Sequence, residues 1–114
     1  MEITETVYRT TGKYGRSAGT WVHLDAPLEG KVLRFETSKG QQGCLATSIT
    51  CWEPTGLEGM LQFPLYGGFS RRVCTHPKRV TEKLVREQHE RVLATLDDFI
   101  KEAVEFFYPV TAAA

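Results

Sequence analysis

The sequence has no charge excess and no long apolar run. Its 114 residues include 14 Lys and Arg and 14 Asp and Glu, so the formal net charge is zero. A chain without a basic excess is poorly suited to bind nucleic acid or membrane surfaces non-specifically. No apolar segment approaches the length of about 18 residues that a membrane-spanning helix needs. These absences point away from general polyanion binders and membrane proteins.

Cysteines are few, and their number is odd. The chain has three of them, Cys44, Cys51 and Cys74. An odd count in a chain large enough to fold without cross-links favours reduced thiols. Cys44 and Cys51 lie seven residues apart in one predicted strand, so they face opposite ways and are not expected to form a disulfide. The first ten residues lack the apolar run of a signal peptide, so we expect a cytoplasmic protein.

The sequence also lacks the common catalytic motifs. It has no GxGxxG opening a helix, no GxxxxGK[ST], no HExxH and no GxSxG. These motifs mark nucleotide-binding, metalloprotease and hydrolase sites. We therefore expect a protein that is not an enzyme and that has no cofactor.

The composition that is present indicates an ordinary globular domain. Hydrophobic residues make up 41% of the chain and charged residues 25%, and at this length a single domain over residues 1–114 is expected. Residues 1–76 consist of short segments rich in Val, Thr and aromatic residues, separated by turns with Gly or Pro. This pattern predicts an antiparallel sheet of five to six strands, at residues 3–10, 21–24, 31–36, 44–53, 60–65 and 69–74. Residues 11–20 are predicted to be a loop.

The remaining segment predicts one long helix over residues 79–108. Apolar residues recur at helical spacing through Val85, Val92, Leu96, Phe99 and Ala103, and Pro109 ends the pattern. The expected fold is α+β, with this helix packed on one face of the sheet and a disordered tail at 111–114. A helix of about 28 residues would be about 42 Å long. That exceeds the width of a domain of this size, so its N-terminal half should overhang the sheet.

The charges along this predicted helix are sorted. Residues 78–91 contain five basic and three acidic side chains, whereas residues 92–108 contain four acidic side chains and one lysine. The dipole of a single helix favours the reverse order. Two antiparallel copies would place basic half against acidic half, so a C2 homodimer through the helix is one hypothesis. Its basic candidates are Lys83, Arg86 and Arg91; the alternative is a solvated face without a partner.

Three residues of the sheet are candidates for protein binding. A sheet covered on one side leaves its other face open, and Trp21, His23 and Arg34 are expected to line that face. An exposed tryptophan would be a meaningful signal, because tryptophan is usually well buried.

A metal site is a weaker hypothesis. Cys74 and His76 lie two residues apart and, with His23 and a second cysteine, offer the ligand types of a zinc site. No CxxC or HxxxH spacing supports such a site. The alternative is a buried thiol beside a loop histidine, so no metal is expected.

A nucleic-acid interface is the main alternative. Aromatic and basic residues are interleaved along the predicted sheet and its loops, where they could stack on bases and contact phosphates; the loop at residues 13–16 and the basic stretch at residues 71–79 are the proposed contacts. The candidates are Lys13, Tyr14, Arg16, Arg71, Arg72, Lys78 and Arg79.

The sequence thus favours a small cytoplasmic, non-catalytic binding or regulatory protein. It would act through protein–protein contacts, either on the open sheet face or on the charge-sorted helix. A nucleic-acid-binding regulator is the first alternative and a thiol or zinc-dependent enzyme the second. Its partner would be another protein or a second copy of itself, with nucleic acid possible and no membrane.

Overall fold

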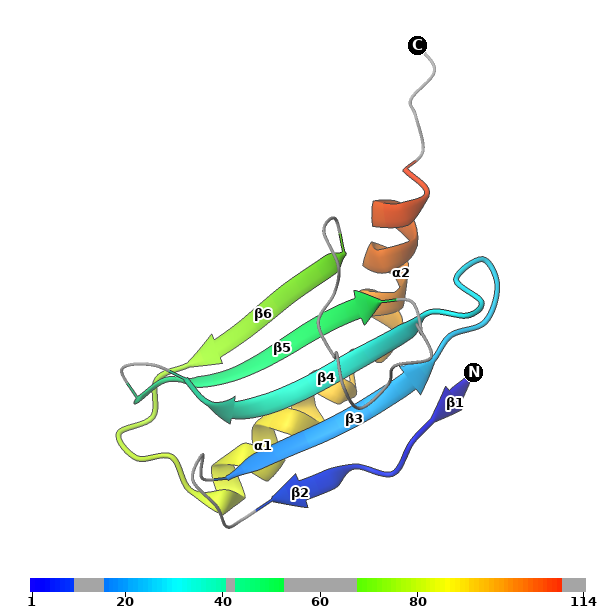
Figure 1. Cartoon of the computed structure of the whole chain (residues 1–114). Coiled ribbons are helices and arrows are strands. Elements are labelled where there is room, and N and C mark those ends of the chain that lie inside the picture. Colours follow the sequence, from blue (N-terminus) through cyan, green and yellow to red (C-terminus); the bar gives the residue numbers. More distant parts are fainter. Residues whose placement is uncertain (10–15, 41–42, 53–67, 110–114) are drawn as a thin grey trace.

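The computed structural model describes residues 1–9, 16–40, 43–52 and 68–109, and its fold is α+β (Figure 1). An antiparallel sheet is covered on one face by two helices. The strands are β1 (Glu2–Ile3), β2 (Val7–Arg9), β3 (Ser17–His23), β4 (Val32–Lys39), β5 (Leu45–Trp52) and β6 (Phe69–Thr75). The helices are α1 (Glu82–Leu93) and α2 (Leu96–Phe107). The predicted fold class is confirmed.

The sheet is built mostly from strands that are neighbours in sequence. The strand order is β1-β3-β4-β5-β6, and the short strand β2 also pairs with β3. Strands β1 and β2 therefore form one edge, and β6 lies at the other end of the described sheet. All pairs are antiparallel. Strands β4 and β5 pair over their full length, from Val32 opposite Trp52 to Lys39 opposite Leu45.

The core lies between the sheet and the helices. Because side chains alternate along a strand, Val22, Leu33 and Phe35 all face the helices, where they are fully buried. Ile49, Cys51 and Phe69 continue this layer, and Val92, Leu96 and Ala103 cover it from the helices. Helix α1 packs on β3, β4 and β5, whereas α2 contacts β6.

The prediction of one long helix is wrong, because the helix breaks at residues 94–95. The hydroxyl of Thr95 donates to the carbonyl of Val92 at 2.7 Å, and its amide donates to the same oxygen at 3.0 Å. These bonds to the third preceding residue replace the regular pattern of an α-helix. Thr95 then begins α2, because its carbonyl accepts the amides of Asp98 and Phe99. The predicted overhang is wrong as well, since α1 is packed on the sheet along its length.

Two helices also change the meaning of the charge order. Helix α1 has Glu82 in its first turn and Arg91 in its last, and α2 begins with Asp97 and Asp98. Each of these charges complements the dipole of its own helix. Glu105 in the last turn of α2 stays unfavourable, but the charge order no longer opposes the dipole of a single helix, so this argument for a homodimer through the helix is lost.

The strand predictions need three corrections. The segment predicted as one strand over 3–10 is split into β1 and β2, and Thr4 between them exchanges hydrogen bonds with the backbone of Trp21. The predicted loop 11–20 is wrong from Ser17 onward, where β3 begins. Strand β4 extends to Lys39, three residues beyond the prediction. The predicted strand 60–65 and the tail 111–114 lie outside the described residues.

A buried histidine joins α1 to the sheet. His89 is 0% exposed, and its Nε2 and Nδ1 atoms lie 2.8 Å from the hydroxyl oxygens of Thr20 and Thr37, respectively. Both ring nitrogens are therefore satisfied by hydroxyls on adjacent strands. When buried polar groups make all of their hydrogen bonds, they fix the relative position of the helix and strands that carry them.

The hydrogen bonds of His89 continue across the sheet on both sides. Thr37 contacts the hydroxyl of Thr47 at 2.7 Å, and Thr47 accepts from Gln88 Nε2 at 3.1 Å. Gln88 Oε1 accepts from the hydroxyl of Thr75 at 2.5 Å. At the other end the hydroxyls of Thr20 and Thr6 lie 2.6 Å apart. We call this series the polar chain; its members, in order, are Thr6, Thr20, His89, Thr37, Thr47, Gln88 and Thr75.

Burial makes the charged form of His89 costly. It lowers the pKa of His89 below the ordinary value of 6.5. The ring contacts two threonine hydroxyls and, edge-on, the ring of Tyr8, whose centroid is 6.4 Å away. Below pH 6.5 His89 is protonated in the unfolded chain but stays neutral in the folded chain. The contribution of His89 to the free energy of unfolding is therefore fully present above that pH and is lost progressively as the pH falls below it.

We expect the free energy of unfolding to fall below pH 6.5 by up to about 1.4 kcal/mol per pH unit because of His89. Urea unfolding at several pH values between 5 and 8 measures this slope. His89→Gln should remove this component, whereas His23→Gln, at the exposed end of β3, should retain it. Equal slopes in the wild type and His89→Gln would contradict the assignment.

Thr37→Val should lower the free energy of unfolding by about 1–3 kcal/mol, because it leaves His89 Nδ1 and the Thr47 hydroxyl without their shared partner. The matched control is Thr50→Val on the other face of the sheet, which should stay within about 0.5 kcal/mol. Chemical denaturation of both variants at pH 7.5 compares them. Equal stability of the two variants would argue against the polar chain.

Candidate binding site on the helix-free sheet face

The face of the sheet opposite the helices carries a hollow of about 210 Å³. We call it the sheet-face hollow. It is lined from three adjacent strands by Val7, Arg9, Ser17, Ala18, Gly19, Trp21, Arg34 and Glu36. Because side chains alternate along a strand, this face carries residues 17, 19 and 21 of β3 and residues 34 and 36 of β4. The hollow therefore follows from the strand register.

A glycine lets the indole of Trp21 lie close to the sheet. A Cβ atom at Gly19 would come within 3.2 Å of Trp21 Cη2 and 3.3 Å of Cζ3. Such contacts are tighter than those of ordinary side chains, so the ring occupies the space that a side chain at residue 19 would fill. Trp21 is thereby half-buried and presents an aromatic wall to the hollow.

The second wall is an arginine held by two neighbours. The guanidinium carbon of Arg34 lies 5.6 Å from the centre of the Trp21 ring, within the range of a cation–π contact. Arg34 also forms an ion pair with Glu36, two residues along the same face of β4. Only 19% of the Arg34 side chain is exposed, so these contacts restrict its rotamers. The side chain is thus presented in one orientation.

The electrostatic character of the hollow is basic. It contains two guanidinium groups, Arg9 and Arg34, and one carboxylate, Glu36. Arg9 is exposed and has no ion-pair partner among residues 1–9, 16–40, 43–52 and 68–109. The combination of an aromatic wall, a fixed arginine and a solvated arginine is suited to binding a flat or extended group that carries negative charge.

The predicted protein-binding residues of the sheet are only partly brought together. Trp21 and Arg34 are directly opposite one another in the β3–β4 register, and both line the hollow. His23 shares their face but lies at the end of β3, outside the lining.

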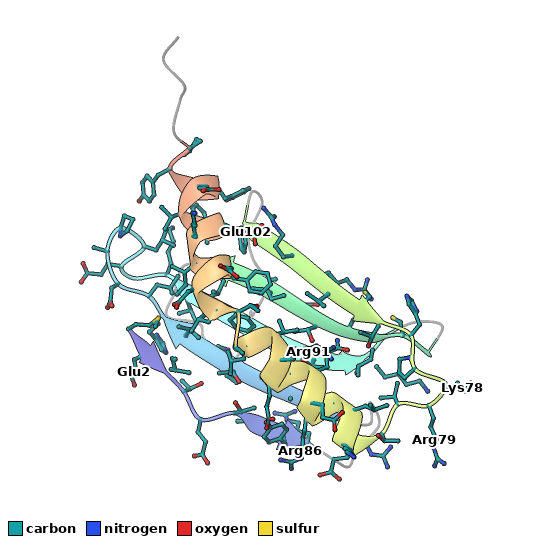
Figure 2. All side chains as sticks on the ribbon, turned by 180° about the vertical axis from the view of Figure 1, so that it is seen from behind. Glu2, Lys78, Arg79, Arg86, Arg91 and Glu102 are labelled. Carbon is teal, nitrogen blue, oxygen red and sulfur yellow. The ribbon has the colours of Figure 1, made fainter. Side chains whose placement is uncertain are left out.

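The three helix candidates do not form one surface, and Figure 2 shows Arg86 and Arg91 on different flanks of α1. Arg86 lies on the β2 side of α1, with its guanidinium 3.9 Å from the centre of the Tyr8 ring. Arg91 lies on the β6 side, and Lys83 is 83% exposed and contacts Glu87 at 3.8 Å. Arg86 also contacts Glu82 at 3.3 Å. The basic charge of α1 is therefore split between two flanks and partly neutralised within the helix.

The nucleic-acid candidates are also dispersed. Arg71 faces the helices and contacts Glu102 of α2 at 3.5 Å, whereas Arg72 faces the other side and lies 3.7 Å from the sulfur of Cys44. Lys78 and Arg79 follow in the exposed linker between β6 and α1 (Figure 2). Arg16 approaches this linker, since its Nη1 donates to the carbonyl of Val80 at 3.4 Å. Lys13 and Tyr14 lie outside the described residues.

The structure does not bring the proposed zinc ligands together. The register places Cys74 opposite Ala46, in the row that ends at Ser17 of β3, whereas His23 is six residues further along that strand. This corresponds to about 20 Å along the sheet. Among the described residues, no three His, Cys, Asp or Glu side chains form a metal-binding group. The three cysteines form no disulfide, and Cys74 is exposed rather than buried.

Sequence reasoning missed the residues that complete the hollow and those of the polar chain. Arg9, Gly19 and Glu36 line the hollow, and the alternation of β2, β3 and β4 could have placed them on the face of Trp21. His89 was overlooked although it lies four residues after Val85 within the apolar stripe of α1. A polar residue in such a stripe is the available signal for a buried hydrogen bond.

Comparisons with known proteins give no relative for this chain. No family model, no curated protein and no solved structure matches it. Within the described part of the chain, no helix is long and apolar enough to cross a membrane.

Gly19→Val should displace the Trp21 ring, because even a single added carbon meets it at 3.2 Å. We expect a shifted indole Nε1–H resonance for Trp21 and a loss of stability of about 1–3 kcal/mol from overpacking. Ser17→Val, two residues along the same face, is the control and should leave that resonance in place. An unchanged Trp21 resonance in Gly19→Val would show that the ring does not lie over residue 19.

Proposed function

We propose that the protein is a small non-catalytic binding protein that captures an acidic, extended segment of another protein in the sheet-face hollow. The observation that carries this proposal is the pairing of Trp21 with Arg34 across β3 and β4, with Arg9 beside them. Aromatic residues and arginine supply much of the binding energy of protein interfaces, because they offer large contact area and directed hydrogen bonds.

The geometry favours a segment rather than a large globular surface. The hollow has a volume of about 210 Å³ and spans β2, β3 and β4, so it fits a few side chains of a peptide. Its two arginines against one glutamate favour acidic residues in that peptide. Arg34 is already oriented by Trp21 and Glu36, which reduces the entropy lost when it binds.

Selection from a random peptide display library tests this function. We expect acidic peptides to be enriched, and a synthetic peptide of the selected sequence to bind at least about tenfold more weakly to Trp21→Ala or Arg9→Gln. Lys83 is exposed on α1, away from the hollow, so Lys83→Gln is the matched control and should bind the peptide as the wild type does. Peptides that bind Trp21→Ala and the wild type equally would contradict a site in the hollow.

Binding of single-stranded nucleic acid is the second candidate. The observation that favours it is the contact of Arg16 with the carbonyl of Val80, which brings a third cation to the linker of Lys78 and Arg79. Titration with a labelled oligonucleotide at several salt concentrations tests it. A steep loss of affinity with salt is expected if phosphates are bound, and Lys78→Gln with Arg79→Gln should reduce that slope. Absence of binding at low salt would exclude this candidate.

A further inference from the structure

A second pocket of about 330 Å³ lies on the other side of the sheet, between α1 and the end of β6. It exists because α1 packs on β3, β4 and β5 and leaves the helix side of β6 uncovered near Thr75. We call it the α1–β6 pocket. It is lined by Leu45, Thr75, His76, Pro77, Leu84, Glu87, Gln88 and Arg91. Its volume is at the lower end of the range of small-molecule sites, about 300–1,000 Å³.

The floor of this pocket accepts hydrogen bonds rather than donating them. Thr75 uses its only hydroxyl hydrogen on Gln88 Oε1, at 2.5 Å. The two hydrogens of Gln88 Nε2 are shared by three acceptors: the carbonyl of Leu45 at 3.0 Å, the hydroxyl of Thr47 at 3.1 Å and the carbonyl of Val73 at 3.4 Å. What the floor has left are the lone pairs of the Thr75 oxygen, so it suits a ligand that carries an N–H or O–H group.

The wall formed by α1 carries one charge of each sign. Glu87 and Arg91 are one helical turn apart, and both line the pocket. Arg91 has no ion-pair partner among the described residues, and Glu87 contacts only exposed Lys83, at 3.8 Å. An exposed pair at that distance is weak. Both charges are therefore available to a ligand, and the apolar wall of Leu45, Leu84 and Pro77 lies beside them.

We propose that the α1–β6 pocket binds a free α-amino acid with an aliphatic side chain. Its carboxylate pairs with Arg91, and its ammonium group donates to Glu87 and to the Thr75 oxygen. The aliphatic side chain contacts Leu45, Leu84 and Pro77. A zwitterion of this size uses the two opposite charges, the accepting floor and the apolar wall together. This site is independent of the sheet-face hollow.

Titration of the intact protein with L-leucine tests the proposal. The observable is the NMR resonance of the Gln88 side-chain amide. Two matched probes each lack one charge: 4-methylpentanoate has no ammonium group, and 3-methylbutylamine has no carboxylate. We expect leucine to shift the resonance saturably, and each matched probe to bind at least about tenfold more weakly because the hydrogen bonds of one charged group are lost.

Two variants separate the charged groups. Arg91→Gln should weaken leucine binding about tenfold and leave the affinity for 3-methylbutylamine unchanged. Glu87→Gln should weaken leucine similarly and leave the affinity for 4-methylpentanoate unchanged. Arg86→Gln, on the opposite flank of α1 (Figure 2), is the control and should bind leucine as the wild type does.

Three results would overturn the proposal. The first is a Gln88 resonance that does not move up to the solubility limit of leucine. The second is equal affinity for leucine and the two singly charged probes. The third is unchanged leucine binding in Arg91→Gln, with the fold of that variant verified by its amide spectrum.

Discussion

The structure depends on one buried residue that hydrogen-bonds on both sides. His89 of α1 contacts Thr20 of β3 and Thr37 of β4 through its two ring nitrogens. Apolar packing alone would allow α1 to slide along the sheet, because hydrophobic contacts have no direction. Hydrogen bonds of fixed geometry in a dry interior do not allow this, since a misaligned helix would leave buried polar groups unsatisfied. The position of α1 in turn determines which part of β6 stays uncovered.

The sequence predicts the layers of this fold better than its details. Alternating residues gave the sheet, and the apolar spacing through Val85 and Val92 gave a helical segment packed on one face. The break at Thr95 was not predicted, because both helices have the same apolar spacing. Only the hydrogen bonds from Thr95 to the carbonyl of Val92 separate them. In one continuous helix the charge order opposes the dipole; with the break, Glu82, Asp97 and Asp98 lie in first turns and Arg91 in a last turn, where the dipole favours them.

The candidate sites were predictable to different degrees. Trp21 and Arg34 could be assigned to one face by alternation, and their register as direct neighbours follows from the β3–β4 pairing. Arg71 and Arg72 looked like one basic stretch, yet adjacent residues of a strand must face opposite sides. The α1–β6 pocket could not be predicted at all. It combines Thr75, Pro77 and Arg91, whose proximity is set by how far α1 extends across the sheet.

The polar chain also fixes the order of its own protons. Thr47 is fully buried and accepts from Gln88, so its hydroxyl hydrogen is satisfied within the chain only by donating to Thr37. Thr37 then donates to Nδ1 of His89, which places the imidazole hydrogen on Nε2, directed at Thr20. Thr20 in turn donates to Thr6, which lies partly exposed at the edge of the sheet. One tautomer of a core histidine is therefore selected by the side-chain amide of the residue that precedes it in α1, through hydroxyl groups on two strands.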